Sequence, residues 1–558
     1  MSEAKAAPTG AAPQARPASP ARGGAALIAA GILLSRLSGL VRQRALGHFL
    51  GIDAAADAYA GALRIPNFLQ NLLGEGVLSA SFIPVYAALR KQGTPEAERD
   101  ARKVAGAVAG LVGLSVGVLA LLGVLGTPVL IDLIAPGFKG ETRALAIQLV
   151  QIFFPGVALL VLSAFCLGVL NSHRRFFLSY AAPVLWNAAI IGALILGGVR
   201  WKLPPTQLAV VAAWGMVAGS ALQLFVQLPS VLRLLGGPRA AIAAIGLGRG
   251  DPHVKTVVGS FLPNVVSRGV VQLSGYIDTV IASWLPVGAL SSLYFAQIVY
   301  MLPVSLFGMS ISAAALPAMS ESHGQEVDAR AAALRDQLQR GLRHIAFPVI
   351  PSAVAFVALG DVIAAALYQT GRFSQADSKY VWAILGGSAI GLLAQTQGRL
   401  YSSTFYALRD TRSPLRYAIV RVALTAGLGL LAALWLPGLL GLPAKWGAVG
   451  LTATAGLAGQ VEFYLLRRGV QRHLGRIEQE GWLQLKLWAA ALLGAAAGWA
   501  VRAAIAYRSG GEGFLTSPLP RAALVLGSFG VVYLLAALAF GAPQAKDALR
   551  RVRRVVGR

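Results

Sequence analysis

The sequence predicts an all-α membrane protein that crosses the bilayer many times. Of its 558 residues, 56% are hydrophobic and only 13% are charged, and the mean hydropathy is +0.64. These values lie outside the range of ordinary soluble chains. Polar or Pro/Gly-rich breaks divide the chain into about fourteen apolar segments, each offering the ~20 residues that a membrane-spanning helix needs. The loops between them are too short for a domain with its own core, which excludes a soluble catalytic domain.

The predicted spans form two pseudo-symmetric six-helix bundles followed by two further helices. The spans lie near residues 25–48, 57–89, 104–134, 143–170, 177–199, 206–232, 257–284, 289–318, 342–367, 378–407, 415–436, 446–467, 484–506 and 519–541. The resulting divisions are a disordered tail (1–24), a first bundle (25–232), a linker (233–256), a second bundle (257–467), a linker with helices 13 and 14 (468–541) and a basic tail (542–558). A separate amphipathic helix is expected along the membrane surface at 321–343, where leucines recur at helical spacing among charges.

An internal duplication supports this division. LSASFIP (78–84) resembles ISAAALP (311–317), and LIAPGF (133–138) resembles LYQTGRF (367–373), at a nearly constant offset. Because the repeat contains six spans, its two copies run in parallel orientation about an axis along the membrane normal.

The charge distribution predicts the orientation of the chain. The net charge of +26 comes from 49 Lys and Arg against 23 acids, a balance that would suggest nucleic acid in a soluble protein. Here the basic residues gather in alternate loops and in the C-terminal tail, so the positive-inside rule places both termini in the cytoplasm and favours an even number of spans. Nucleic acid is therefore not an expected partner, whereas membrane lipids are.

Charged residues inside apolar segments mark a candidate site. Arg36, Arg42, Arg64 and Glu75 lie in stretches otherwise apolar enough for a bilayer. A charge at the bilayer centre costs at least about 2.5–3.5 kcal/mol, so such residues normally face a bundle interior or a wet cavity. Arg42 and Arg44 could instead extend from a helix end to the headgroups, but Arg36 lies near the middle of its predicted helix.

Three segments carry a resemblance to a known family. They are SRLSGLVRQRALGHFLG (35–51), AADAYAGALRIPNFLQNLLGEGVLSASFIPVYAALRKQG (55–93) and APGF (135–138). The chain resembles the MurJ (MviN) family of lipid II flippases, within the multidrug/oligosaccharidyl-lipid/polysaccharide exporter superfamily. The resemblance implies a transporter of the bacterial inner membrane that moves an undecaprenyl-diphosphate-linked peptidoglycan precursor between leaflets. It also implies proteins of cell-wall synthesis as possible partners.

The resemblance implies roles for particular residues. Substrate-binding candidates are Arg36, Arg42, Arg64 and Asn67, to which we add Arg268 from the seventh span; gating or ion-coupling candidates are Asp57, Glu75 and Asp278. Two departures remove expected basic residues: Gln70 follows the Pro-Asn pair where an arginine is common, and Gln297-Ile298 replaces an Asp-Arg pair. Arg268 is expected to compensate for the missing charge at Ile298.

Arginines suit this cargo because their planar forks bind phosphate oxygens in pairs and stay charged when partly desolvated. Arg36 and Arg42 lie about 120° apart on an ideal helix, so a bend at Gly39 or a break near Pro66 and Gly74 is expected to bring charges together. Asp57 and Glu75 are expected to neutralise arginines or to close the cavity by pairing with them. No metal or cofactor is expected; coupling to membrane potential, Na⁺ or H⁺ stays open.

Four alternatives remain at the level of sequence. A flippase for another polyprenyl-diphosphate glycan shares the same cargo chemistry, and a drug or cation antiporter of the same superfamily is left open by Asp57, Glu75 and Asp278. A membrane transferase would need an acid/base or metal constellation, and the six histidines show no metal-ligand spacing. A scaffold would tolerate apolar residues at Arg36 and Arg42.

Overall fold

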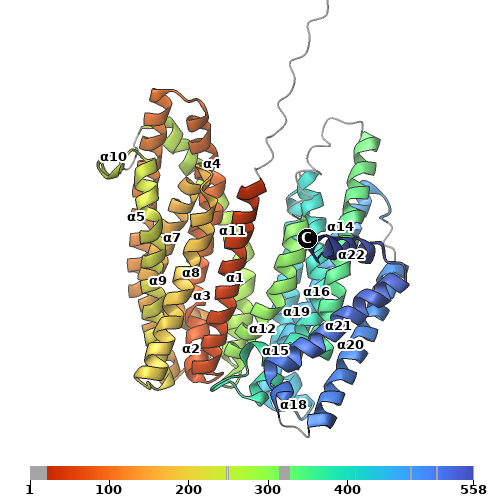
Figure 1. Ribbon diagram of the computed structural model, residues 1–558. Coiled ribbons are helices and arrows are strands. Elements are labelled where there is room, and N and C mark those ends of the chain that lie inside the picture. The colour runs from red at the N-terminus through yellow and green to blue at the C-terminus, as the bar shows by residue number, and fades with distance from the viewer. Residues whose placement is uncertain are drawn as a thin grey trace, which may run out of the picture.

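The computed structural model confirms an all-α fold. It describes residues 22–246, 248, 250–312, 327–408, 410–477, 481–509 and 513–556, and every regular element among these residues is a helix. Figure 1 shows two groups of helices, one formed by the N-terminal half and one by the C-terminal half. The groups approach each other at the end where α2, α12 and α15 lie and diverge toward the opposite end.

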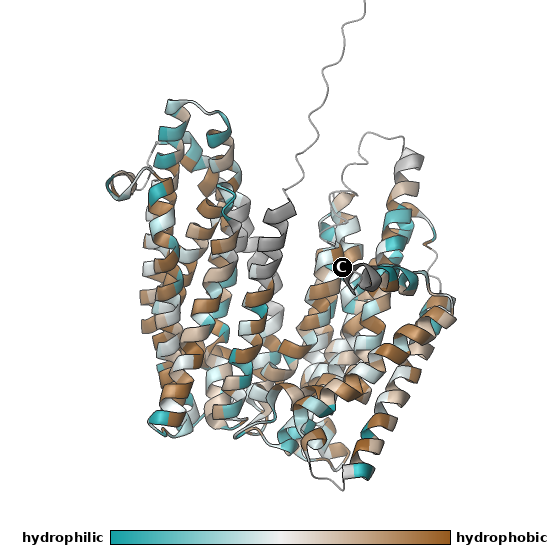
Figure 2. Ribbon diagram, in the orientation of Figure 1, coloured by the Kyte–Doolittle hydropathy of each residue, from teal (hydrophilic) through white to brown (hydrophobic). Residues whose placement is uncertain are grey.

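The helices occupy each of the predicted spans within the described residues. In chain order they are α1 (Arg22–Leu50), α2 (Ala54–Ala62), α3 (Arg64–Leu73), α4 (Glu75–Lys91), α5 (Pro95–Leu125), α6 (Thr127–Ile134), α7 (Gly140–Ser172), α8 (Phe176–Ile195), η1 (Leu196–Arg200), α9 (Pro205–Leu234), α10 (Pro238–Ala243), α11 (Pro252–Ser283), α12 (Ala289–Pro303), η2 (Val304–Met309), α14 (Val327–Ala358), α15 (Gly360–Tyr368), α16 (Gln375–Ala407), α17 (Arg412–Leu434), α18 (Leu436–Leu439), η4 (Ala444–Trp446), α19 (Gly447–Leu474), α20 (Gly481–Ser509), η5 (Phe514–Thr516), α21 (Pro518–Ala539) and α22 (Pro543–Val556). Nine stretches among the described residues meet the length and hydropathy of a membrane span. Figure 2 shows hydrophobic residues along the helices and hydrophilic ones concentrated toward their ends. The protein is therefore a multi-pass membrane protein, while the number of fourteen crossings and the domain boundaries stay predictions.

The second predicted span is not one continuous helix. The segment 57–89 is divided among α2, α3 and α4, with breaks at Leu63 and Gly74. Gly74 adopts φ −82° and ψ −145°, and a Cβ there would lie 2.2 Å from the carbonyl oxygen of Gln70. Because only glycine fits this close backbone approach, Gly74 ends α3 and lets the chain restart as α4.

The amphipathic segment at 321–343 is not a separate helix. Its residues from 327 onward form the first part of α14, which continues to Ala358 as a candidate span, and 321–326 lie outside the described residues. Leu334, Leu338 and Leu342 are fully buried. The apolar stripe is therefore covered by protein, and the segment is continuous with a candidate membrane-spanning helix.

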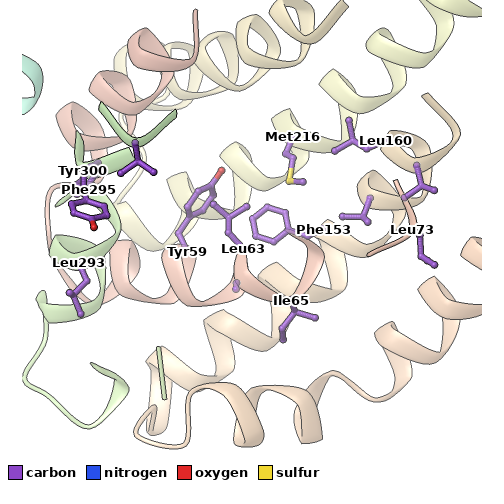
Figure 3. Close-up of a cluster of buried hydrophobic side chains, with 14 of the residues drawn as sticks. Tyr59, Leu63, Ile65, Leu73, Phe153, Leu160, Met216, Leu293, Phe295 and Tyr300 are labelled. Carbon is purple, nitrogen blue, oxygen red and sulfur yellow. The ribbon is translucent and has the colours of Figure 1, made fainter. Parts of the chain in front are cut away.

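Each half has its own packing partners. In the N-terminal half, α7 packs against α2, α4, α5 and α9, and α11 lies against α3 and α4 as well as α17. Figure 3 shows part of this core, where Tyr59 of α2 meets Phe153 of α7 with ring centroids 5.5 Å apart. A second core, separate from the main one, joins α20 and α21 to α14 and α15.

Candidate functional site

Besides the packing of α11 against α3 and α4, the two halves make a group of contacts at one end of the molecule. We call it the closed end and define it by α2, the turn at 51–53, the start of α12 and the loop at 369–374. Gly137 N donates to Ser283 Oγ at 3.0 Å here, and Gln43 Nε2 donates to Tyr294 Oη at 3.0 Å. The halves are thus joined where α1 and α2 meet α12 and α15.

Among the charged residues described at the closed end, Asp57 makes the most hydrogen bonds to the other half. Its Oδ2 accepts from Gly288 N at 2.7 Å, and its Oδ1 accepts from Ser291 N at 2.7 Å and from Ser291 Oγ at 2.6 Å. These amides belong to the first turn of α12, whose donors have no partner within the helix. The carboxylate also favours the positive end of the helix dipole. Asp57 therefore caps a helix of the other half, and the expected pairing with an arginine is not what this conformation contains.

A glycine makes the close approach at Asp57 possible. Gly288 has φ +91°, and a Cβ on it would lie 2.6 Å from the carbonyl oxygen of Ile52. A side chain at this position would both strain the backbone and separate the two halves. The start of α12 is thus built to receive the 51–53 turn directly.

Arg44 forms the complementary contact at a helix C-terminus. Its Nη1 donates to Ala366 O at 2.5 Å and to Leu367 O at 3.3 Å, which are carbonyls of the last turn of α15. Those carbonyls lack partners within the helix, and a guanidinium favours the negative end of its dipole. Arg44 is therefore bound to the other half rather than extended to headgroups.

The two facing loops add backbone and side-chain contacts. Arg372 N donates to His48 O at 2.9 Å, and His48 Nδ1 lies 2.9 Å from Thr370 Oγ1. An ion pair joins Arg372 Nη2 to Asp53 Oδ2 at 3.3 Å, with the two side chains 54% and 36% exposed. Since exposed ion pairs contribute little, the backbone bond is the stronger element of this contact.

Arg36 lies away from the closed end and also reaches the other half. Its exposed side chain donates from Nη1 to Ser305 Oγ at 3.2 Å. Ser305 lies in η2, a π-helical turn that begins directly after Pro303. Such turns are frequent at functional sites. Arg36 therefore contacts the other half away from the closed end, and its role in binding substrate stays a prediction.

Arg42 is held within its own half. Its Cζ lies 4.5 Å from the ring centroid of Trp186, and its Nε is buried without a hydrogen-bond partner in the described structure. The neighbouring Asn187 donates from Nδ2 to Ser38 Oγ at 2.8 Å. α1 stays continuous through Gly39, so Arg36 and Arg42 keep separate partners and are not brought together by a bend.

Arg64 and Asp278 come together across α3 and α11. Tyr276 Oη donates to Arg64 O at 2.8 Å, and the Asp278 carboxyl lies within electrostatic range of the Arg64 and Arg421 guanidinium groups. Asp278 Oδ1 is buried without a hydrogen-bond partner among the described residues. Asn67, three residues after Arg64, is half-buried on α3. This part of the predicted site is thus assembled, and α11 connects it to α17.

Several predicted residues are placed only in part. Glu75 begins α4 and Arg268 lies within α11, but both side chains are outside the described part of the structure. Gln70 is half-buried, and Gln297 is exposed on α12, two helical turns before Ser305. The compensation of Ile298 by Arg268 stays a prediction.

Charged residues of the second bundle were missed by the sequence analysis. Arg421 of α17 pairs with Glu462 of α19, with Nε and Oε2 2.8 Å apart, and Arg399 is exposed on α16. They carry the signal that identified Arg36, because each is a charge inside an apolar helix.

Comparisons with known proteins agree with this architecture. The family model described as lipid II flippase MurJ matches residues 46–516. A lipid II flippase MurJ from Burkholderia cenocepacia is 30% identical over 514 residues, covering 91% of this chain and 94% of that protein. A probable lipid II flippase MurJ from Haemophilus influenzae is 30% identical and covers 79% and 84%.

Solved structures show the same fold. A structure titled lipid II flippase MurJ in an inward closed conformation aligns with a TM-score of 0.71 and 22% identity, covering 94% of this chain and all of that one. An inward-facing multidrug resistance MATE transporter of the MOP superfamily aligns with a TM-score of 0.62 and 15% identity over 80% of this chain. From its sequence match over most of its length, this chain belongs to the lipid II flippase MurJ family.

Proposed function

We propose that this protein is a lipid II flippase, a transporter rather than an enzyme, which works by alternating access between its two halves. The family match over residues 46–516 carries this proposal. The position of Arg36 between the halves supports it, because an anionic lipid head needs a cation there while its tail stays in lipid. A drug antiporter is less well supported, since its cargo would favour acids over arginines.

In this proposal one group of residues binds the substrate and a second group holds the halves together at the closed end. The diphosphate is bound by Arg36 and Arg64. Arg42 joins them once its guanidinium has moved away from the Trp186 ring. Asp57 and Arg44 hold the closed end through helix termini of the other half. Release of these caps would let the halves separate at the closed end, so that the head passes from one side to the other.

We further propose that the closed end faces the periplasm and that both chain termini are cytoplasmic, in a bacterial inner membrane. The basic loops support this orientation through the positive-inside rule. An inside-negative potential would then favour outward movement of the anionic head by about 2.3 kcal/mol per charge per 100 mV, if the charge crosses the full field. Asp278 and Glu75 are the candidates for coupling to H⁺ or Na⁺, to be tested by collapsing each gradient separately.

Complementation tests the function. The wild-type chain is expressed in a strain depleted of its own lipid II flippase, and the leaflet location of lipid II is measured. We expect growth and periplasmic exposure of lipid II, with Arg36→Ala as the inactive control at equal protein level. Lipid II that accumulates in the cytoplasmic leaflet would contradict the proposal, and rescue of a different polyprenyl-diphosphate glycan would reassign the cargo.

A further inference from the structure

A row of alternating charges extends from the first bundle into the second, and the proposed function has not yet used its members Arg421, Glu462 and Arg399. It runs from Arg64 through Asp278, Arg421 and Glu462 to Arg399, and each neighbouring pair lies in contact or within electrostatic range. The five residues come from five different helices, α3, α11, α17, α19 and α16. The row therefore connects the N-terminal half to the interior of the C-terminal half.

Arg421 and Glu462 are costly residues in their positions. Arg421 lies nine residues inside the candidate span Arg412–Leu434, where a charged side chain is costly unless it has polar partners. Their side chains are 27% and 20% exposed, which leaves each within reach of water or a ligand. α17 and α19 already pack closely along their length, with Gly450 against Ala432 O. The ion pair is therefore not needed to hold these helices together.

The pair is connected to the helix that contacts Arg36. Tyr300 of α12 donates from Oη to Gln395 Oε1 at 2.8 Å, and both Arg399 and Arg421 lie within electrostatic range of Tyr300. Gln395 and Arg399 are one turn apart on α16, so they lie on the same face. Arg36 of the other half therefore lies next to η2, which follows α12, and Arg399 and Arg421 lie within electrostatic range of Tyr300 on α12.

We propose that Arg399 and Arg421 are the anion-binding residues of the C-terminal half, specific for the phosphate groups of the lipid substrate. Glu462 is the internal anion that occupies Arg421 while the site is empty. This inference rests on the proposed function, and it supplies from α16 and α17 the positive charge that Ile298 lacks. A diphosphate that enters displaces the carboxylate, because a guanidinium binds phosphate oxygens in the same paired geometry.

Binding of undecaprenyl diphosphate and of lipid II to the purified full-length protein tests this inference. Glu462→Gln removes the carboxylate that pairs with Arg421 and is expected to tighten binding of both ligands. Arg421→Gln/Glu462→Gln removes one of the two proposed cations and its carboxylate partner, while Arg399 and two hydrogen-bonding side chains stay. It is expected to weaken binding of both ligands about 10- to 100-fold, the value of charge-assisted hydrogen bonds. The matched control is Arg502→Gln/Asp361→Asn, which removes an ion pair of the same 2.8 Å length between α20 and α15 and is expected to bind as wild type does.

The outcomes separate this inference from the proposed function. Wild type that binds neither ligand contradicts the proposed function itself. Suppose that Arg421→Gln/Glu462→Gln binds and transports as wild type does, with a thermal unfolding midpoint near that of the control. The ion pair would then be merely structural, and the inference would be overturned. Weakening for lipid II but not for undecaprenyl diphosphate would overturn the assignment to phosphate.

Discussion

At the closed end, charged side chains of the first half contact backbone groups of the second, whereas Arg36 reaches the second half through a serine hydroxyl. Asp57 binds two amides of α12 and Arg44 binds two carbonyls of α15. Helix termini present these groups together and with a favourable dipole, so one side chain satisfies several of them. The Arg36 contact is a single bond at 3.2 Å from an exposed guanidinium to a half-buried serine. The closed end is therefore suited to holding one conformation, and the Arg36 contact is suited to exchanging serine for another hydrogen-bond partner.

The largest effect is expected from the residues that face the cargo. Arg36→Ala and Arg42→Ala should each abolish transport while leaving membrane protein levels nearly normal. Lysine at either position should rescue only in part, because a point charge replaces a fork. Flipping assays beside immunoblots measure this, and wild-type rates in both alanine variants would eliminate the proposed cation site.

Asp57→Ala should act on the conformation instead of on binding. Loss of three hydrogen bonds to a carboxylate is expected to lower the ratio of closed to open forms about 100-fold, or about 3 kcal/mol. Transport then falls although the substrate still binds, because turnover needs both forms. Disulfide cross-linking between Ile52→Cys and Val287→Cys reports the closed form. An unchanged cross-linking yield would show that Asp57 does not hold the closed end together. Arg36→Ala serves as the control, because it is expected to leave this yield unchanged.

Arg44→Gln should weaken the closed end by a smaller amount. Its two carbonyl contacts at the end of α15 are expected to contribute about 1 kcal/mol, or about a fivefold change in the same cross-linking ratio. If Arg44→Gln changes membrane insertion while the ratio of closed to open forms stays constant, Arg44 binds lipid headgroups and does not hold the closed end.

Arg372→Gln should have the smallest effect. The Arg372–Asp53 pair is 54% and 36% exposed, and such pairs are worth about 0–1 kcal/mol. We expect less than about a fivefold change, shrinking further at high salt because exposed charges are screened. A larger change would show that the side-chain pair, and not the Arg372 N to His48 O bond, holds the loops.

The fold was largely predictable because hydropathy and span length act locally. The break of the second span at Gly74 was expected from the sequence, whereas the end of α2 at Leu63 was not. The amphipathic run that forms the first part of α14 was not assigned correctly, because Leu334 and Leu338 are covered by other helices. Such tertiary contacts leave no periodic signal in the sequence.

The site was predictable where a charge in an apolar helix marks it. Arg36 was named as a candidate in this way. Arg421 and Glu462 carry the same mark but lie outside the three segments, 35–51, 55–93 and 135–138, that carry the resemblance in the sequence, although the family match covers them. The partner of a charge was less predictable: Asp57 was expected beside an arginine, and it binds the amide groups of α12 instead. Helix termini offer partners that depend on how the halves dock, which the sequence does not encode locally.

The distance between the halves at the closed end tests alternating access most directly. Trp201 and Trp435 are exposed positions on opposite halves at this end. Spin labels attached at Trp201→Cys and Trp435→Cys, in a Cys166→Ala background, report the distance between the halves. In lipid bilayers without lipid II, we expect one dominant short distance, and addition of lipid II or the Asp57→Ala substitution should populate a second, longer one. A single distance that neither lipid II nor Asp57→Ala changes would contradict the account.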